Sequence, residues 1–143
     1  NLERITPPYR MVLAWDKTKR LNSITVHKKC ASSLLLILNK ISLHFGSEQA
    51  IEANRMHLFG GCFNFRMMRG ANKLSMHSHG CAIDLDPESN PLGKAYWEPA
   101  GMMPMAVVEI FRSFRDSGES LPRTSMMPCG PRRPEIWTLH LAS

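Results

Sequence analysis

The stretch VHKKCASSLLLILNKISLHFG, residues 26–46, carries the clearest structural pattern in the chain. Its apolar residues recur at intervals of three and four, at Val26, Cys30, Leu34, Ile37, Ile41 and Phe45. This interval is the period of an amphipathic α-helix, whereas a half-buried strand would alternate. Gly46 follows the last apolar position as a C-terminal stop. The pattern predicts a helix over residues 26–45 with one face on the core.

The 22 residues at the start of the chain form a polar N-terminal arm, with Pro7 and Pro8 near its front. Apolar side chains alternate along this arm, at Tyr9, Met11, Leu13 and Trp15. Alternation is typical of a strand that buries one face. We therefore expect an irregular or extended arm that lays these four side chains onto the body.

Shorter elements are expected after the long helix. Ser47 is a helix-capping residue, and it predicts a short helix that ends near Arg55. The glycines at 60 and 61 predict a turn that leads into a strand within CFNFRMMRG, residues 62–70. CAIDLD, residues 81–86, is apolar enough for a buried strand.

A second helix is predicted from Pro104 to about Ser117, because proline favours the first helical turn and Gly118 can end the helix. The tail of residues 118–143 is rich in Ser, Pro, Arg and Met, and it predicts loop with a short strand in IWTLHL. Helix, strands, helix and terminal strand together favour one α+β domain over residues 1–143. We expect a small, mostly antiparallel sheet with helices packed on one side.

The chain is basic, with 18 Lys and Arg against 12 Asp and Glu and a formal charge of +6. Such a charge favours polyanions, among them nucleic acid, anionic membranes and the bacterial cell wall. The basic residues are scattered, and no predicted helix presents them as one stripe. We therefore expect no nucleic-acid partner.

Four cysteines are present, Cys30, Cys62, Cys81 and Cys129, and none forms a C-x-x-C pair. This spacing indicates neither a zinc ribbon nor a dense disulfide scaffold, so we expect reduced and mostly buried thiols. No apolar run is long enough to span a membrane, and the N-terminus lacks the apolar region of a signal peptide. A protein made in the cytoplasm is expected.

A His and a carboxylate stand seven residues apart in SMHSHGCAID, residues 75–84. Imidazole nitrogen and carboxylate oxygen are both ligands that zinc accepts. An odd offset would point His77 and Asp84 to opposite faces of an unbroken strand. Their convergence on one metal requires a bend, and Gly80 supplies the backbone freedom for it.

This string, S-x-H-x-x-G-x-A-x-D, resembles the metal-binding signature of the zinc D-alanyl-D-alanine carboxypeptidase and L-alanyl-D-glutamate endopeptidase family, which includes many phage endolysins. Residues 60–93 look like the family's central block, and PYRMVLAWD and VHKKCASSL are similar to its phage-type members. The resemblance implies a hedgehog/DD-peptidase-like fold.

The resemblance also implies roles for four residues. His77 and Asp84 are two ligands of a zinc ion, Ser75 steadies the site, and Arg66 binds substrate or stabilises negative charge. For Arg66 the alternative is a surface arginine in a salt bridge. His79 is expected to be packed or partly exposed instead of acting as a further ligand.

The family completes its site with a C-terminal acid-x-x-His motif, in which the His binds zinc and the acid is the general base. His140 is the C-terminal histidine of this chain, but Trp137 stands where the acid should be. Glu135 lies five residues before His140 and would need a backbone bulge to serve as the base. An altered reading frame in the tail, which would leave an inactive enzyme, is one hypothesis for this departure.

The sequence therefore predicts a monomeric, Zn²⁺-dependent peptidase of peptidoglycan stem peptides. The prediction places His77, Asp84 and His140 on the metal and gives Glu135 and Arg66 catalytic roles. An endolysin-type endopeptidase is favoured over a D-Ala-D-Ala carboxypeptidase, and such an enzyme would reach the wall after holin action or lysis. The alternative is a catalytically inactive zinc or cell-wall-binding remnant.

Overall fold

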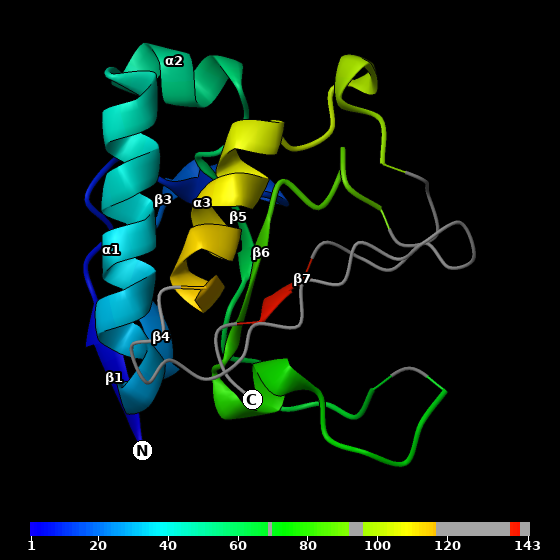
Figure 1. Cartoon of the computed structure of the whole chain (residues 1–143). Coiled ribbons are helices and arrows are strands. Elements are labelled where there is room, and N and C mark those ends of the chain that lie inside the picture. Colours follow the sequence, from blue (N-terminus) through cyan, green and yellow to red (C-terminus); the bar gives the residue numbers. More distant parts are fainter. Residues whose placement is uncertain (69, 92–95, 117–137, 141–143) are drawn as a thin grey trace.

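The structure is a computed structural model, and it describes residues 1–68, 70–91, 96–116 and 138–140. Its elements follow the order β1 (Leu2–Ile5), β2 (Val12–Leu13), β3 (Asp16–Arg20), β4 (Ile24–His27), α1 (Lys28–Phe45), α2 (Glu48–Ala53), β5 (Leu58–Gly61), η1 (Met76–His79), β6 (Ala82–Leu85), η2 (Glu98–Ala100), α3 (Met105–Asp116) and β7 (Thr138–His140). Helices and strands mix along the chain, so the predicted α+β class is confirmed (Figure 1).

The strands form two sheets. Five of them lie in the order β3-β2-β5-β6-β7, and β1 pairs with β4 in a separate antiparallel ribbon. Within the larger sheet only β2 and β5 run parallel, and the other neighbours are antiparallel. The expected mostly antiparallel sheet is therefore confirmed, with β6 between β5 and β7.

The long helix was predicted closely, because its apolar period places a buried stripe along one face of α1. It ends at Phe45, where Gly46 takes the left-handed conformation with φ 74°. It begins at Lys28, two residues later than predicted, because Val26 belongs to β4 and the His27 side chain caps the helix. Figure 1 shows α1 beside α3, and the two helices are in contact.

Two of the shorter predictions need correction. The two glycines at 60 and 61 lie inside β5, which ends before the CFNFRMMRG segment predicted as a strand. Gly60 suits a strand because a Cβ there would meet Pro87 Cγ at 2.9 Å and Asp84 Cβ at 3.0 Å. In the N-terminal arm, which contributes β1, β2 and β3, Tyr9 and Met11 are buried but Trp15 is 69% exposed.

Other elements follow the predictions. Ser47 caps α2, which ends at Ala53, slightly earlier than expected. The predicted strand in CAIDLD is β6, and the helix after Pro104 is α3. In the tail, β7 falls within IWTLHL, and residues 117–137 lie outside the described part of the chain.

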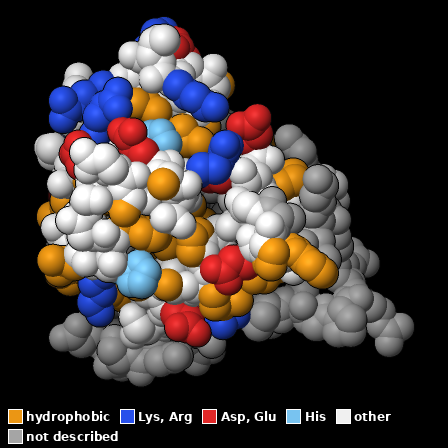
Figure 2. Space-filling view, turned by 90° about the horizontal axis from the view of Figure 1, so that it is seen from above, with side chains coloured by type: hydrophobic (Ala, Val, Ile, Leu, Met, Phe, Trp, Pro, Cys, Tyr) orange, Lys and Arg blue, Asp and Glu red, His pale blue; other side chains and the backbone are white. Residues whose placement is uncertain are grey.

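The core lies where α1 and α3 meet the sheets. Its largest fully buried side chains are Met11, Ile24, Leu34, Ile37, Leu38, Ile41, Ile51, Met56, Leu58, Ile83, Leu85 and Phe111. On the face shown in Figure 2, Lys and Arg side chains occupy several separate places, with acidic side chains between them. In the part of the chain that the structure describes, no helix is both long and apolar enough to span a bilayer.

Candidate metal centre

A short helical turn and a strand carry the two predicted metal ligands. Ser75 is the N-cap of η1, and its Oγ accepts a hydrogen bond from the backbone N–H of His77 at 3.3 Å. Gly80 ends the turn in the left-handed conformation with φ 69°, and β6 with Asp84 follows. The bend expected between His77 and Asp84 thus consists of a 3-10 turn and one glycine.

Gly80 is required by its surroundings as well as by its backbone angle. A Cβ atom there would lie 2.9 Å from the backbone nitrogen of His27 and 3.2 Å from the carbonyl carbon of Val26. Backbone atoms cannot turn away as a flexible side chain can. In addition, the N–H of His27 donates to the Gly80 carbonyl at 2.9 Å, which anchors the turn against the start of α1.

We expect Gly80→Ala to lower the free energy of unfolding by about 3 kcal/mol, because a left-handed alanine costs about 1 kcal/mol and the backbone clash adds to it. Gly46→Ala is a matched control: Gly46 has φ 74° and nothing within 4 Å of its added Cβ. That variant should lose only about 1 kcal/mol. Urea unfolding of both variants measures the difference, and equal losses would show that the contact with His27 is unimportant.

The imidazole of His77 is held in one orientation. The residue is 2% exposed, and its Nδ1 lies 2.8 Å from the carbonyl oxygen of Cys62. A carbonyl oxygen only accepts hydrogen bonds, so Nδ1 carries the hydrogen and the lone pair of the neutral ring is on Nε2. A metal-binding histidine is commonly fixed in this way by a carbonyl or carboxylate on its other nitrogen.

The free nitrogen of that ring points toward Asp84. His77 Nε2 lies 3.3 Å from Asp84 Oδ2, and Nε2 is buried without a hydrogen bond in the structure. A buried polar atom without a hydrogen bond is costly unless something else satisfies it. His77 and Asp84 are therefore close enough for an ion pair, but they form no hydrogen bond through Nε2. Two ligands that share a cation would have this arrangement.

The distance also fits zinc. Bonds of about 2.0–2.1 Å at the tetrahedral angle place two N or O ligands about 3.3–3.4 Å apart. The spacing of His77 Nε2 and Asp84 Oδ2 therefore equals that of two ligands on a tetrahedral zinc.

The backbone of β7 brings His140 to the neighbourhood. In the register of β6 and β7, His140 is opposite Ala82, and Thr138 is opposite Asp84. Directly opposed residues share a face of a sheet, as do residues two apart. By register, His140 thus lies on the same face as Asp84, one pair further along. Glu135 and Trp137 lie outside the described residues.

Arg66 is hydrogen-bonded through its backbone to the turn that carries His77. Its N–H donates to Ser78 Oγ at 2.8 Å, and that hydroxyl donates to the Arg66 carbonyl at 2.6 Å. The N–H of Ser75 donates to the same carbonyl at 3.0 Å. Among the described residues, no ion-pair partner for the half-buried Arg66 side chain is found. His79, two residues beyond His77, is exposed.

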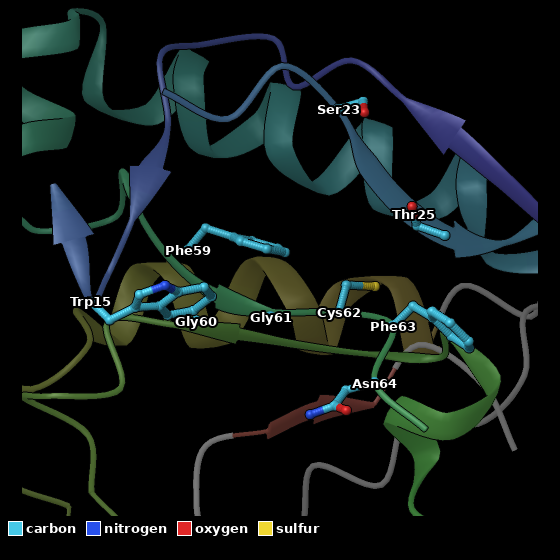
Figure 3. A pocket seen from close by; sticks show the side chains of 9 residues that line it. All are labelled: Trp15, Ser23, Thr25, Phe59, Gly60, Gly61, Cys62, Phe63 and Asn64. Atoms are coloured by element: carbon cyan, nitrogen blue, oxygen red, sulfur yellow. The ribbon is translucent and has the colours of Figure 1, made fainter. Parts of the chain in front are cut away.

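A pocket of about 340 Å³ lies on the far side of β5 from β6 (Figure 3). Two of its lining residues connect it to the His77–Asp84 pair: Gly61 is the register partner of Asp84, and the Cys62 carbonyl lies 2.8 Å from His77 Nδ1. Gly60 and Gly61 line the pocket without side chains, and three aromatic rings, of Trp15, Phe59 and Phe63, line it as well. The lining residues are Trp15, Ser23, Thr25, Phe59, Gly60, Gly61, Cys62, Phe63 and Asn64.

The sequence reasoning missed the ion pair that holds the far end of β6. Arg55 meets Asp86 through two hydrogen bonds, Nε to Oδ2 at 3.0 Å and Nη2 to Oδ1 at 2.9 Å. These bonds, with a further one to Glu88, raise the pKa of the Arg55 guanidinium. Asp86 directly follows β6, and it is 1% exposed.

Residues 69–115 match the model of a family described as D-alanyl-D-alanine carboxypeptidase. No curated protein and no solved structure gives a significant match to the chain. The likeness expected for residues 8–16, for residues 26–34 and for Arg66 lies outside the matched segment and stays a prediction. The segment that brings His77 and Asp84 together is similar to the D-alanyl-D-alanine carboxypeptidase family, whose members are zinc peptidases.

Proposed function

We propose that this protein is a zinc-dependent peptidase that cleaves an amide bond in the stem peptides of bacterial peptidoglycan. The observation that carries the proposal is the His77–Asp84 pair, with Nε2 and Oδ2 3.3 Å apart and Nδ1 held by a carbonyl. The family match over residues 69–115 supports the same assignment. As in the sequence analysis, the favoured type is an endolysin-like L-alanyl-D-glutamate endopeptidase.

The chain's own residues would share the work as follows. His77 and Asp84, with His140 as the proposed third ligand, would hold zinc. Zinc in such a site lowers the pKa of a water molecule toward ~7 and polarises a carbonyl group. Glu135 is the proposed general base, which would take a proton from the attacking water and give it to the leaving amine. Arg66 would bind a substrate carboxylate or the developing oxyanion.

The register of β7 supports His140 in this role, because it places residue 140 on the face of the sheet that carries Asp84. A third protein ligand from a neighbouring strand would leave one position of the zinc open, as catalytic zinc sites require.

The rival within the same class is a carboxypeptidase that removes a terminal D-alanine, and Trp137 at the expected acid position favours an inactive wall-binding remnant as a second candidate. Digestion of purified peptidoglycan with the zinc-loaded protein, followed by mass spectrometry, separates these outcomes. Cleavage between L-Ala and D-Glu supports the endopeptidase, and release of D-Ala alone supports the carboxypeptidase. Stoichiometric zinc with no cleavage would establish the remnant.

The pocket beside β5 is the proposed place for the peptide stem, and Trp15 is its most exposed aromatic residue. We expect Trp15→Ala to raise KM for a soluble stem peptide about threefold to tenfold, since one lost aromatic contact is worth roughly 1 kcal/mol. The value of kcat should change little, because Trp15 does not touch the metal-bearing pair.

Trp97→Ala is the matched control, because Trp97 is 64% exposed and does not line the pocket. Its KM should stay within twofold of wild type. A KM change of equal size in both variants would mean that the pocket does not bind the stem.

A further inference from the structure

A second cluster of metal-binding side chains lies apart from the His77–Asp84 pair. It consists of His27, Cys30 and Cys81, and one ligand atom from each lies within 4.8 Å of the others. His27 ends β4, Cys30 is in the first turn of α1, and Cys81 directly precedes β6. Segments 51 residues apart in sequence thus bring two sulfurs and an imidazole together. We propose that these three residues form a second, thiolate-containing zinc site.

The separation of the two sulfurs suits a metal. Cys30 Sγ and Cys81 Sγ are 3.5 Å apart. Two thiolates on a tetrahedral zinc, with bonds of about 2.3 Å, lie about 3.8 Å apart. The sulfurs would therefore move by only a few tenths of an ångström to bind zinc, whereas a disulfide of about 2.05 Å requires a much larger approach.

The donor set distinguishes this cluster from the peptidase site. Two sulfurs and one imidazole nitrogen are soft ligands. Such ligands favour zinc over magnesium or calcium. The His77–Asp84 pair offers nitrogen and oxygen instead. Cys81 directly precedes β6 and Asp84 lies within it, and the two sites share no residue. The two sites are therefore adjacent but separate.

Negative charge on the two sulfurs would depend on the bound cation, because burial opposes that charge and only the start of α1 favours it. Cys30 is the third residue of α1, where the helix N-terminus is positive, and Lys28 and Lys29 precede it. Burial raises the pKa of the Cys30 thiol to about 12 and raises that of Cys81 as well. Both thiols are thus neutral near pH 7 without a metal, and zinc would displace two protons on binding.

His27 gives the cluster its access and its structural effect. The two cysteines are 0% and 5% exposed, but His27 is only partly buried, so the ring borders solvent. Its Nδ1 accepts the N–H of Lys29 at 3.2 Å as the cap of α1, a bond that coordination through Nδ1 would give up and coordination through Nε2 would keep. The His27 N–H also donates to Gly80 at 2.9 Å. A bound zinc would therefore fasten the start of α1 to the turn that carries His77.

Cobalt(II) absorption tests this proposal, because thiolate ligands produce an intense charge-transfer band that nitrogen and oxygen ligands do not. The experiment uses the reduced full chain with Cys129→Ser, which removes the cysteine outside the described residues. We expect the band in this protein and in its His77→Ala variant. It should disappear in Cys30→Ser and in Cys81→Ser.

Cys62→Ser is the matched control, since Cys62 is a buried thiol of the same region that does not belong to the cluster. It should keep the band. Zinc stoichiometry separates the two sites: two per chain in the parent protein, one after His77→Ala and one after Cys30→Ser. Loss of the peptidase zinc alone would therefore not be mistaken for loss of the cluster.

A folding defect in Cys30→Ser or Cys81→Ser could also abolish the band. A measurement on the parent protein, in which both cysteines are intact, excludes that explanation. Zinc should slow the alkylation of two thiols relative to the zinc-free protein, and mass spectrometry should place these thiols at Cys30 and Cys81. Absence of the charge-transfer band in the reduced parent protein, persistence of the band in Cys30→Ser and Cys81→Ser, or alkylation of both thiols at the same rate with and without zinc would each overturn the proposal.

Discussion

We expect His77→Ala to lose one zinc per chain and to lower kcat/KM on peptidoglycan by on the order of a thousandfold. The substitution removes a buried imidazole whose Nε2 lies 3.3 Å from Asp84 Oδ2. Metal catalysis contributes several kcal/mol of transition-state stabilisation, and each 1.36 kcal/mol corresponds to tenfold in rate. Loss of about 4 kcal/mol therefore gives the expected reduction.

His79→Ala is the matched control for that variant. His79 belongs to the same turn, η1, but is exposed. Its zinc content should equal that of wild type, and its activity should stay within about threefold because its side chain lies outside the pair. Zinc content and initial rates on the same peptidoglycan preparation measure both effects. Full activity in His77→Ala, or equal losses in both variants, would remove His77 from the metal site.

The parts of the fold that follow local periodicity could be predicted from the sequence. The helix α1 has a clear 3.6-residue period and a glycine stop, and β6 is a short apolar run followed by turn residues. The meeting of His77 and Asp84 could also be anticipated, because a glycine between a histidine and a carboxylate permits the required bend. The structure shows how that bend is made.

Features that depend on distant contacts could not be read in this way. A glycine pair normally indicates a turn, but Gly60 lies within β5 because Pro87 and Asp84 crowd it. Trp15 continues an alternating pattern and yet is exposed, because β2 and β3 form a hairpin there whose register shifts after Val12. Such outcomes depend on which strands become neighbours.

Two further features depend on distant contacts: the clustering of Cys30 with Cys81, and the pairing of Arg55 with Asp86. Each joins residues more than thirty positions apart. Single-sequence patterns indicate burial of a cysteine or solvation of an aspartate, but they do not show which partner a side chain will meet. Asp86 can be buried because Arg55 pairs with its carboxylate.

The Arg55–Asp86 pair leads to the second large prediction, which concerns stability. Arg55→Ala should lower the free energy of unfolding by about 3 kcal/mol, because it leaves the carboxylate of Asp86 buried without its partner. This value is the lower end of the range for breaking a buried ion pair, because the Arg55 side chain is 35% exposed. Urea unfolding, followed by circular dichroism, measures the change.

Arg10→Ala is the control for loss of an ion pair as such. Arg10 and Glu52 also lie 2.9 Å apart, but their side chains are 45% and 41% exposed. Exposed pairs contribute roughly 0–1 kcal/mol, so this variant should be close to wild type. Equal losses in Arg55→Ala and Arg10→Ala would mean that burial of Asp86 does not decide the effect.

A double-mutant cycle identifies the cause of the loss. If the unpaired charge is responsible, Asp86→Asn in the Arg55→Ala background should recover part of the stability, because a neutral amide is cheaper to bury than a carboxylate. Arg55→Lys should fall between wild type and Arg55→Ala, since an ammonium keeps the charge but cannot make both hydrogen bonds of the guanidinium fork. No recovery in the double variant would instead point to lost packing of the Arg55 side chain as the source of the effect.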